Sequence, residues 1–182
     1  MKSKKKPFLL VLDGPMGTGK TTVSKLLNEK LEGTARVGLD NVKRFISGFE
    51  KDHKYTKITQ KVIHAMVNEY LKSGVSVITE WVMRKERVEH FIKIAKKNNV
   101  RFFTYELDAP KHLLIKRIKQ RHFKQIRQKS EEFPKRTINE TKKNFEKNYN
   151  FHIENRYDHT KTLDSEKLSA DQIVKKILKD IK

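Results

Sequence analysis

The chain has 182 residues, a hydrophobic fraction of 36% and a formal net charge of +20. Its length suits one domain over residues 1–182, and no apolar run approaches the roughly 18 residues that a membrane-spanning helix needs, so we expect a soluble, cytoplasmic protein with no membrane partner. The absence of cysteine excludes disulfides and thiolate metal sites, while the positive charge indicates a polyanionic partner such as nucleic acid or reflects a lysine-rich coding bias.

The first half of the chain alternates short apolar runs with amphipathic segments. Phe8–Leu12 is a continuous apolar run, which is typical of a strand that is buried on both faces. Apolar residues then recur at helical spacing from Val23 to Leu31, and Gly33 ends that helix. The pattern goes on to predict a strand over Ala35–Leu39, a helix over Asn41–Phe49, a long helix over about 56–72 and a strand over Val75–Thr79.

The second half repeats this alternation. It predicts a helix over 88–95, a strand over 101–107, a helix that Pro110 opens, and a last strand over 160–163. Residues 119–150 are polar, basic and weakly periodic, and we expect a helical, mobile, solvent-facing lid there. A capping box at Ser169–Gln172 precedes the final helix. The whole pattern predicts the α/β class, with a five-stranded parallel sheet, helices on both faces and a helical basic lid.

The turn after the first apolar run matches the phosphate-binding pattern G-x-x-x-x-G-K-[ST] at Gly14–Thr21. Glycines there let backbone N–H groups converge on phosphate oxygens, and the following helix directs its positive dipole end to the same point. Lys20 would reach the β- and γ-phosphates of ATP, and the Thr21 hydroxyl would bind Mg²⁺. The predicted ATP-binding residues of this segment are Gly14, Pro15, Met16, Gly17, Thr18, Gly19, Lys20, Thr21 and Thr22.

A phosphate loop does not name the reaction, because ATPases, GTPases, helicases and small kinases share it. The chain has no Asn/Thr-Lys-x-Asp motif for guanine, which argues against a GTPase. Motor ATPases generally need a larger chain and a strand that ends in paired acids, whereas the third strand here ends in a single acid, Glu80. The sequence therefore favours a small kinase.

Two acids follow strands of the predicted sheet. Asp40 follows the second strand and Glu80 the third, and the carboxyl ends of parallel strands line one crevice, so both acids are expected beside the phosphate loop. Asp40 could accept the proton of an attacking hydroxyl, or it could cap the helix over 41–49. Glu80 could bind substrate or hold Mg²⁺ through water, or it could be a solvated loop acid.

Two arginines, Arg117 and Arg121, stand one helical turn apart and share a face with Lys124. Guanidinium groups are suited to bidentate contact with phosphate, and the alternative is a solvated basic stripe. The surrounding segment 111–147 holds 13 Lys or Arg against four Glu, which concentrates positive charge there. That concentration is harder to assign to coding bias alone.

Together, these motifs resemble those of small P-loop kinases that phosphorylate hydroxyls, and in particular the kinase domain of phage polynucleotide kinase, over roughly residues 7–125. The layout is also similar to that of chloramphenicol phosphotransferase, gluconate kinase and the zeta toxins, so it leaves the acceptor open. The resemblance implies that Asp40 is the catalytic base and that Arg121 stabilises the transferring phosphoryl group from the lid. It rests on the phosphate loop, Asp40, Lys43, Arg44, the segment 53–57, Glu80, Arg84, Arg87, Ala109, Pro110, Lys116, Arg117 and Arg121.

The sequence departs from that family at two places. The family's Asp-x-x-Arg is Asp40-Asn-Val-Lys43 here, with Arg44 one place later. Its Asp-Thr-Asn after the third strand is Glu80-Trp81-Val82, where the tryptophan could stack on a base or ring of the acceptor, or belong to the core.

We therefore predict an ATP- and Mg²⁺-dependent kinase that transfers the γ-phosphate to an acceptor hydroxyl of a small molecule or nucleoside-like substrate. The alternatives are a polynucleotide 5′-hydroxyl kinase and, third, a non-enzymatic, ATP-gated module that binds single-stranded nucleic acid. The predicted catalytic residues are Lys20, Asp40 and Arg121, with Arg117 as a further ATP ligand. The predicted substrate-binding residues are Asp40, Lys43, Arg44, Glu80, Trp81 and Arg84, and the oligomeric state stays open.

Overall fold

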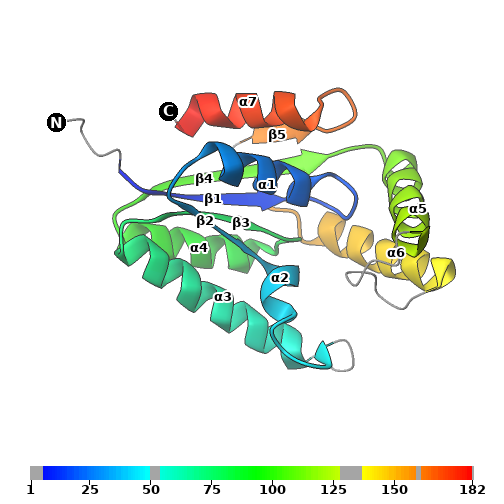
Figure 1. The fold of residues 1–182 in the computed structure, drawn as a ribbon, viewed down its shortest axis with the longest axis horizontal. Coiled ribbons are helices and arrows are strands. Elements are labelled where there is room, and N and C mark those ends of the chain that lie inside the picture. The colour runs from blue at the N-terminus through cyan, green and yellow to red at the C-terminus, as the bar shows by residue number, and fades with distance from the viewer. Residues whose placement is uncertain (1–5, 50–53, 128–136, 159–160, 182) are drawn as a thin grey trace.

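The computed structural model describes residues 6–49, 54–127, 137–158 and 161–181 (Figure 1). Within these ranges, five strands form one parallel sheet in the order β2-β3-β1-β4-β5. Because they all run in one direction, their carboxyl ends meet at the same edge. The predicted α/β class and sheet are confirmed. The strands are β1 (Phe8–Asp13), β2 (Thr34–Gly38), β3 (Ser76–Glu80), β4 (Arg101–Asp108) and β5 (Lys161–Asp164).

Helices lie on both faces of the sheet, as predicted (Figure 1). α1 and α7 pack together on one face, α3 and α4 on the other, and α2, α5 and α6 lie toward the carboxyl ends of the strands. No helix in the described ranges is long and apolar enough to cross a membrane. The helices are α1 (Lys20–Lys30), α2 (Leu39–Lys43), α3 (Lys54–Lys72), α4 (Lys85–Lys97), α5 (Lys111–Arg127), α6 (Ile138–Glu154) and α7 (Ala170–Ile181).

The central position of β1 explains why the first apolar run is continuous. The strand pairs with β3 on one side and β4 on the other. Its side chains alternate between two cores, with Leu9 and Val11 in the cluster beneath α3 and α4, and Leu10 and Leu12 in the cluster beneath α1 and α7. All four are fully buried, and burial of each such side chain contributes about 1.5–3 kcal/mol. Both faces of the strand therefore have to be apolar.

Two predicted helix starts are confirmed. Ser169 and Gln172 form a capping box, in which the Gln172 N–H donates to Ser169 Oγ (3.3 Å) and the Ser169 N–H donates to Gln172 Oε1 (2.8 Å). The Pro110 carbonyl accepts from two N–H groups in the first turn of α5. A further capping box, between Thr137 and Glu140 at the start of α6, was not predicted.

The helix after β2 differs from its prediction. β2 ends at Gly38 and α2 covers only Leu39–Lys43, in place of a helix over 41–49. Gly38 has an extended backbone (φ −100°, ψ 145°) and takes the N-cap position itself. Asp40 therefore lies within the first turn, and the interpretation of Asp40 as the helix cap is wrong.

The segment predicted as a solvent-facing lid is more buried than expected. Residues 128–136 lie outside the described residues, while α5 before them and α6 after them are helical as predicted. Phe145 of α6 and His152, just beyond the predicted lid, are only 2% and 1% exposed, so the solvent-facing interpretation is wrong for one face of that helix. Phe145, Tyr149 and His152 recur at helical spacing and form the buried face of α6. The residues between them are mostly polar, so the hydrophobic periodicity is too weak to recognise this face from the sequence.

Two histidines, His64 and His90, lie in contact between α3 and α4. The His64 ring stacks on His90, with ring centroids 4.1 Å apart. Burial, together with the charges of His90 and Arg87, lowers the pKa of His64 to about 4. Histidine in the unfolded chain has a pKa of about 6.5. Between these two pH values the unfolded chain binds a proton that the folded chain does not, which favours unfolding.

We therefore expect the free energy of unfolding to fall as the pH drops from about 6.5 to about 4, and to change no further through this group at lower pH. Water screens the partly exposed ring, so the loss should be on the order of 1 kcal/mol. His64→Phe should remove this loss in chemical denaturation at a series of pH values. His112→Phe, at an exposed position of α5, should retain it. A His64→Phe protein with unchanged pH dependence would contradict the assignment.

Candidate active site

The phosphate-loop segment Gly14–Thr21 joins β1 to α1 at the carboxyl edge of the sheet (Figure 1). Gly14 has a φ of +133°, and a Cβ atom there would lie 2.1 Å from the Leu107 carbonyl oxygen, so no other residue fits. Gly19 has a φ of +94° and nothing within 4 Å of its Cβ position, which leaves the loop open on that side. Both glycines therefore support the shape that the motif predicts.

The start of α1 presents an open set of backbone donors. Its N-cap residue is Gly19, which has no side chain to accept from the first N–H groups of the helix. The Thr21 and Thr22 side chains of the first turn are exposed. An uncapped helix N-terminus beside a glycine loop fits the phosphate groups of a nucleotide, and the Thr21 hydroxyl is an oxygen ligand of the kind that Mg²⁺ prefers.

Lys20 is the first residue of α1, and its side chain folds back over the loop. Its Nζ donates hydrogen bonds to the carbonyl oxygens of Gly14 (2.7 Å) and Pro15 (2.9 Å). Burial lowers the pKa of this amine, so the loop holds a partly desolvated positive charge. Phosphate oxygens are stronger acceptors for an ammonium group than carbonyl oxygens, so nucleotide phosphates would replace these partners.

Charged side chains from four elements act on Lys20. Against the lowering effect of burial, the charges of Asp13, Glu80 and Asp40 raise the pKa of Lys20, whereas that of Arg121 lowers it. These residues come from β1, β3, α2 and α5, which converge around the phosphate loop. The structure thus brings the predicted residues Lys20, Asp40, Glu80 and Arg121 within electrostatic reach of one point.

Asp13 was not predicted as a site residue. It is fully buried at the end of β1, where its Oδ1 accepts from the N–H groups of Gly14 (2.6 Å) and Met83 (2.8 Å). The carboxylate therefore joins the first residue of the phosphate loop to the segment after β3. A polar residue that ends an apolar run directly before Gly14 is the signal that could have identified it.

The two predicted acids have different surroundings. Asp40 is exposed in the first turn of α2. Glu80 is only 7% exposed, and its Oε1 accepts from Arg36 Nη1 of β2 at 2.6 Å. The interpretation of Glu80 as a solvated loop acid is therefore wrong, because the residue closes β3 next to β2. Its Oε2 is buried and has no hydrogen-bond partner among the described residues, so one acceptor oxygen remains available.

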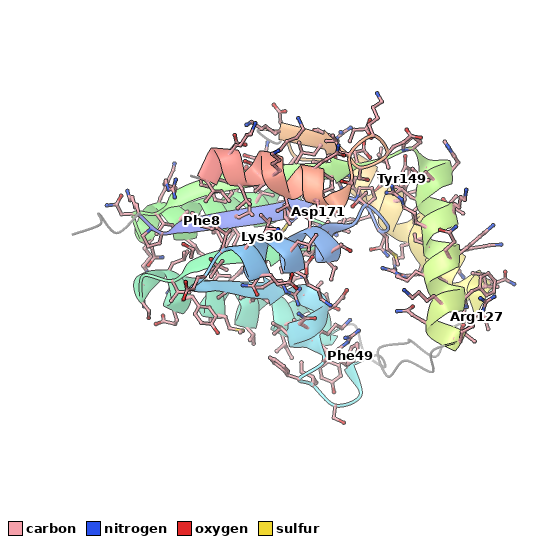
Figure 2. The ribbon with its side chains drawn as sticks, turned by 45° about the horizontal axis from the view of Figure 1, so that its top comes forward. Phe8, Lys30, Phe49, Arg127, Tyr149 and Asp171 are labelled. Atoms are coloured by element: carbon pink, nitrogen blue, oxygen red, sulfur yellow. The ribbon has the colours of Figure 1, made fainter. Side chains whose placement is uncertain are left out.

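The two predicted arginines of α5 also differ. Arg117 donates to the hydroxyl (3.0 Å) and the carbonyl (2.6 Å) of Ser165, and its Nη1 lies 3.4 Å from the Gly17 carbonyl oxygen. It therefore joins the phosphate loop to the loop after β5, and the solvated-stripe interpretation is wrong for it. Arg121, one turn further, is exposed. In Figure 2, α5, which ends at Arg127, lies past the carboxyl ends of the strands.

Residues 9–148 match a family model described as an AAA domain. The chain belongs to this AAA domain family. The matched span contains the phosphate loop and also Asp40, Glu80 and Arg121, so the residues that converge on Lys20 all lie within it. No curated protein matches the sequence.

Solved structures of kinases share the fold of this AAA domain protein. A candidate kinase from Chloroflexus aurantiacus is 18% identical, with 96% of this chain and 98% of that chain covered and a TM-score of 0.70. The APS kinase CysC of Mycobacterium tuberculosis, in complex with AMPPNP and APS, is 14% identical, with 98% of each chain covered and a TM-score of 0.64. A chain of the Pnkp1/Rnl/Hen1 RNA repair complex is 19% identical, with 86% of this chain and 48% of that chain covered and a TM-score of 0.63. The P-loop kinase fold, and the resemblance that the motifs indicate, are thereby confirmed.

Three predicted substrate-binding residues of this AAA domain protein contact its own side chains. Trp81 is 5% exposed and belongs to the core beneath α3 and α4, so its core interpretation holds and the stacking interpretation does not. The Arg84 guanidinium lies 4.6 Å from the ring centroid of Phe151 on α6. The Lys43 amine lies 5.5 Å from the ring centroid of Phe49. Of these three, only the two cations could turn toward a substrate.

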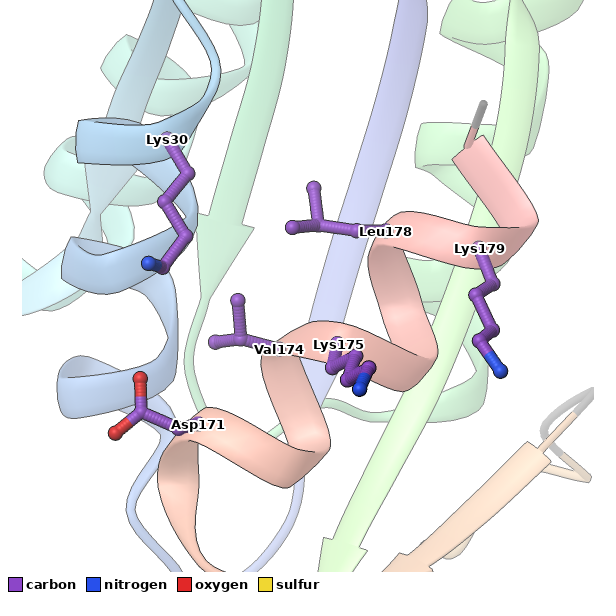
Figure 3. A pocket seen from close by; sticks show the side chains of 6 residues that line it. All are labelled: Lys30, Asp171, Val174, Lys175, Leu178 and Lys179. Carbon is purple, nitrogen blue, oxygen red and sulfur yellow. The ribbon is translucent and has the colours of Figure 1, made fainter.

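Two hollows in the described part of the chain are lined by residues other than those of the phosphate loop. One, of about 460 Å³, lies between α1 and α7 (Figure 3). Lys30 lines it at the end of α1, whereas the phosphate loop precedes the start of that helix. The other, of about 430 Å³, lies beside β4, β5 and α6, with Glu106 and His152 in its wall. Neither contains a predicted site residue.

Proposed function

We propose that this chain is an ATP- and Mg²⁺-dependent kinase that transfers the γ-phosphate of ATP to an acceptor hydroxyl of a small molecule or nucleoside-like substrate. The observation that carries the proposal is that Asp40 and Arg121 act electrostatically on Lys20, which is the first residue of the uncapped helix α1. The shared fold supports it, because one kinase with that fold was solved with AMPPNP, an analogue of ATP.

Each charged residue then has a distinct task. Lys20 would bind the phosphates from the loop, and Arg121 would approach them from α5, so both would stabilise the negative charge that develops on the transferring group. Thr21 is the residue that would hold Mg²⁺, with the available oxygen of Glu80 as a further acceptor for its water. The metal, when bound, supplies neutralisation of phosphate charge. Asp40 would accept the proton of the acceptor hydroxyl, since its exposed carboxylate is accessible to a substrate.

Asp40→Asn should lower the rate of transfer by roughly 10²–10⁴-fold with little change in ATP affinity, because the amide keeps the size of the carboxylate but cannot take up the proton. Transfer rates and binding of an ATP analogue measure these effects separately. Asp171→Asn is a matched control, since Asp171 is also an exposed aspartate in the first turn of a helix, α7. It should change neither quantity. Normal turnover of Asp40→Asn would show that another group is the base.

A polynucleotide 5′-hydroxyl is the second candidate acceptor. Exposed basic and aromatic side chains occur on two segments toward the carboxyl ends of the strands (Figure 1), with Arg44 and Phe45 after α2, and Arg121, Phe123 and Lys124 on α5. The Phe45 and Phe123 side chains are 78% and 51% exposed. Basic groups contact phosphates and aromatic rings stack on bases, so such a surface fits a single strand. One structure with this fold belongs to an RNA repair complex.

Labelled ATP distinguishes the two acceptor classes. A polynucleotide kinase would label an oligonucleotide with a 5′-hydroxyl but not the same oligonucleotide with a 5′-phosphate, and log K for binding would fall with log salt by about 0.7 per phosphate contacted. Equal affinity for both ends without label transfer would leave the small-molecule acceptor. Binding that needs an ATP analogue but leads to no transfer would instead support a non-enzymatic module.

A further inference from the structure

A buried histidine connects α6 to the residue that precedes the phosphate loop. His152, in the last turns of α6, is 1% exposed. Near it lie Asp13 and Glu106, which are 0% and 1% exposed and are register partners on β1 and β4. Register partners on neighbouring strands project from the same face of a sheet, so the two carboxylates lie side by side at one imidazole.

Each ring nitrogen of His152 faces one of these carboxylates. Nε2 lies 2.9 Å from Glu106 Oε1, and Nδ1 lies 3.9 Å from Asp13 Oδ1. Burial raises the pKa of Glu106, but hydrogen bonds from His152, Arg156 and Thr162 outweigh burial and bring the pKa to about 2. Glu106 is therefore ionised at neutral pH and can only accept. It follows that Nε2 of His152 carries a proton and donates it.

The second nitrogen connects the histidine to the phosphate loop. Nδ1 is buried and has no hydrogen-bond partner among the described residues. A displacement of about 1 Å would bring it within hydrogen-bond distance of Asp13, and the contact needs a proton on Nδ1 as well as on Nε2, so that the ring donates to both carboxylates. Asp13 in turn accepts from the N–H groups of Gly14 and Met83, and among the acids its charge acts most strongly on Lys20. A shift of the His152 ring would therefore move Asp13, and with it the acceptor of the Gly14 N–H and the negative charge that acts on Lys20.

The rest of α6 connects this point to α5. Lys111 Nζ of α5 pairs with Glu146 Oε2 of α6 at 2.8 Å. Phe145 of α6 packs in one buried cluster with Leu114 and Ile118 of α5. Arg121 lies on α5. The position of α6 on the sheet therefore also affects the position of the Arg121 backbone.

We propose that His152 is a positioning residue for phosphoryl transfer, which holds Asp13, and with it the first residue of the phosphate loop, in register with α6 and α5. The inference rests on the proposed kinase function. His152 is buried, so it would act through Asp13 and not by contact with a substrate. In an alternative role, the histidine would only hold α6 against β4. The hydrogen bond from Nε2 to Glu106 would then be sufficient, and Nδ1 would have no function.

His152→Gln separates these two roles. The glutamine amide can replace Nε2 as the donor to Glu106, but it places no nitrogen opposite Asp13. We expect the melting temperature to stay close to that of the wild type, while kcat falls by roughly 10–100-fold and KM for ATP changes much less, because a small misplacement of catalytic groups is costly. The amide signal of Gly14, whose N–H donates to Asp13, should move in a ¹H–¹⁵N spectrum.

His122→Gln is the matched control. His122 is a second buried histidine of this helix pair, 4% exposed, and its Nδ1 lies 3.2 Å from Thr141 Oγ1 between α5 and α6. This variant should lower the melting temperature but leave the Gly14 signal in place. A His152→Gln protein with wild-type kcat and an unmoved Gly14 signal would overturn the proposal, as would a loss of kcat that follows only the loss of folded protein.

Two further outcomes are decided by spectroscopy. If the wild-type chain transfers no phosphate, the proposed function fails, and an unmoved Gly14 signal in His152→Gln would overturn the positioning link as well. If His152→Gln does not fold, Asp13→Asn replaces it, because asparagine Oδ1 can still accept from Gly14 and Met83. The ring-nitrogen signals of His152 should then shift, and unchanged signals would overturn the proposal.

Discussion

Lys20→Ala is expected to reduce phosphoryl transfer to background. The amine is the positive group on the phosphate loop itself, and its removal takes away charge stabilisation as the phosphate oxygens gain negative charge, a loss worth at least roughly 10²–10³-fold for a single donor. Binding of the ATP phosphates should weaken as well. Equilibrium binding of an ATP analogue and single-turnover transfer rates measure the two effects.

Unfolding does not account for this loss. Burial lowers the pKa of Lys20, which means that the fold disfavours the charged amine, so the alanine variant should melt at no lower temperature. Lys25→Ala, at an exposed position one turn further along α1, is the control and should leave transfer unchanged. Undiminished transfer by Lys20→Ala would eliminate the phosphate-loop assignment.

Arg121→Ala is expected to lower the turnover rate by about 10³–10⁵-fold, the range for arginines that stabilise a transferring phosphoryl group. ATP binding should fall much less, because the exposed Arg121 side chain is needed in the transition state rather than in the complex with ATP. Arg121→Lys should restore little activity, since an ammonium group does not reproduce the planar, bidentate fork of a guanidinium.

Arg127→Ala provides the comparison for Arg121. It removes an exposed arginine from the last turn of the same helix, so it changes the net charge of α5 equally. Turnover should stay near the wild-type value. If Arg121→Ala and Arg127→Ala behave alike, α5 is only a basic surface and the transition-state role of Arg121 is excluded.

The features that were predicted correctly depend on patterns within short, contiguous segments of the sequence. The apolar run of β1 and the glycine loop after it are contiguous in the chain, so residue type and spacing identify them without knowledge of the fold. The Ser169 capping box is equally local. Convergence of Asp40 and Glu80 on the loop followed from a general property of parallel sheets, that strand ends of one kind share an edge.

The missed residue Asp13, and the unpredicted surroundings of Glu80 and Trp81, depend on contacts between distant segments. Asp13 binds the Met83 N–H across 70 residues of chain, and Glu80 pairs with Arg36 across 44. Nothing near Glu80 in the sequence indicates that an arginine of the neighbouring strand will cover it. The burial of Trp81 likewise follows from how α3 and α4 pack on the sheet, which no local pattern around the tryptophan encodes.

Transfer of label from γ-labelled ATP tests the proposed chemistry most directly. The wild-type chain and Lys20→Ala would be incubated in parallel, with and without Mg²⁺, with a set of small alcohols and nucleosides or with single-stranded oligonucleotides that end in a 5′-hydroxyl. We predict that the wild-type chain alone, and only with Mg²⁺, forms a labelled phosphate ester in one of the two acceptor sets. Label that stays in ATP, or that appears solely as inorganic phosphate, would contradict a kinase that acts on a hydroxyl.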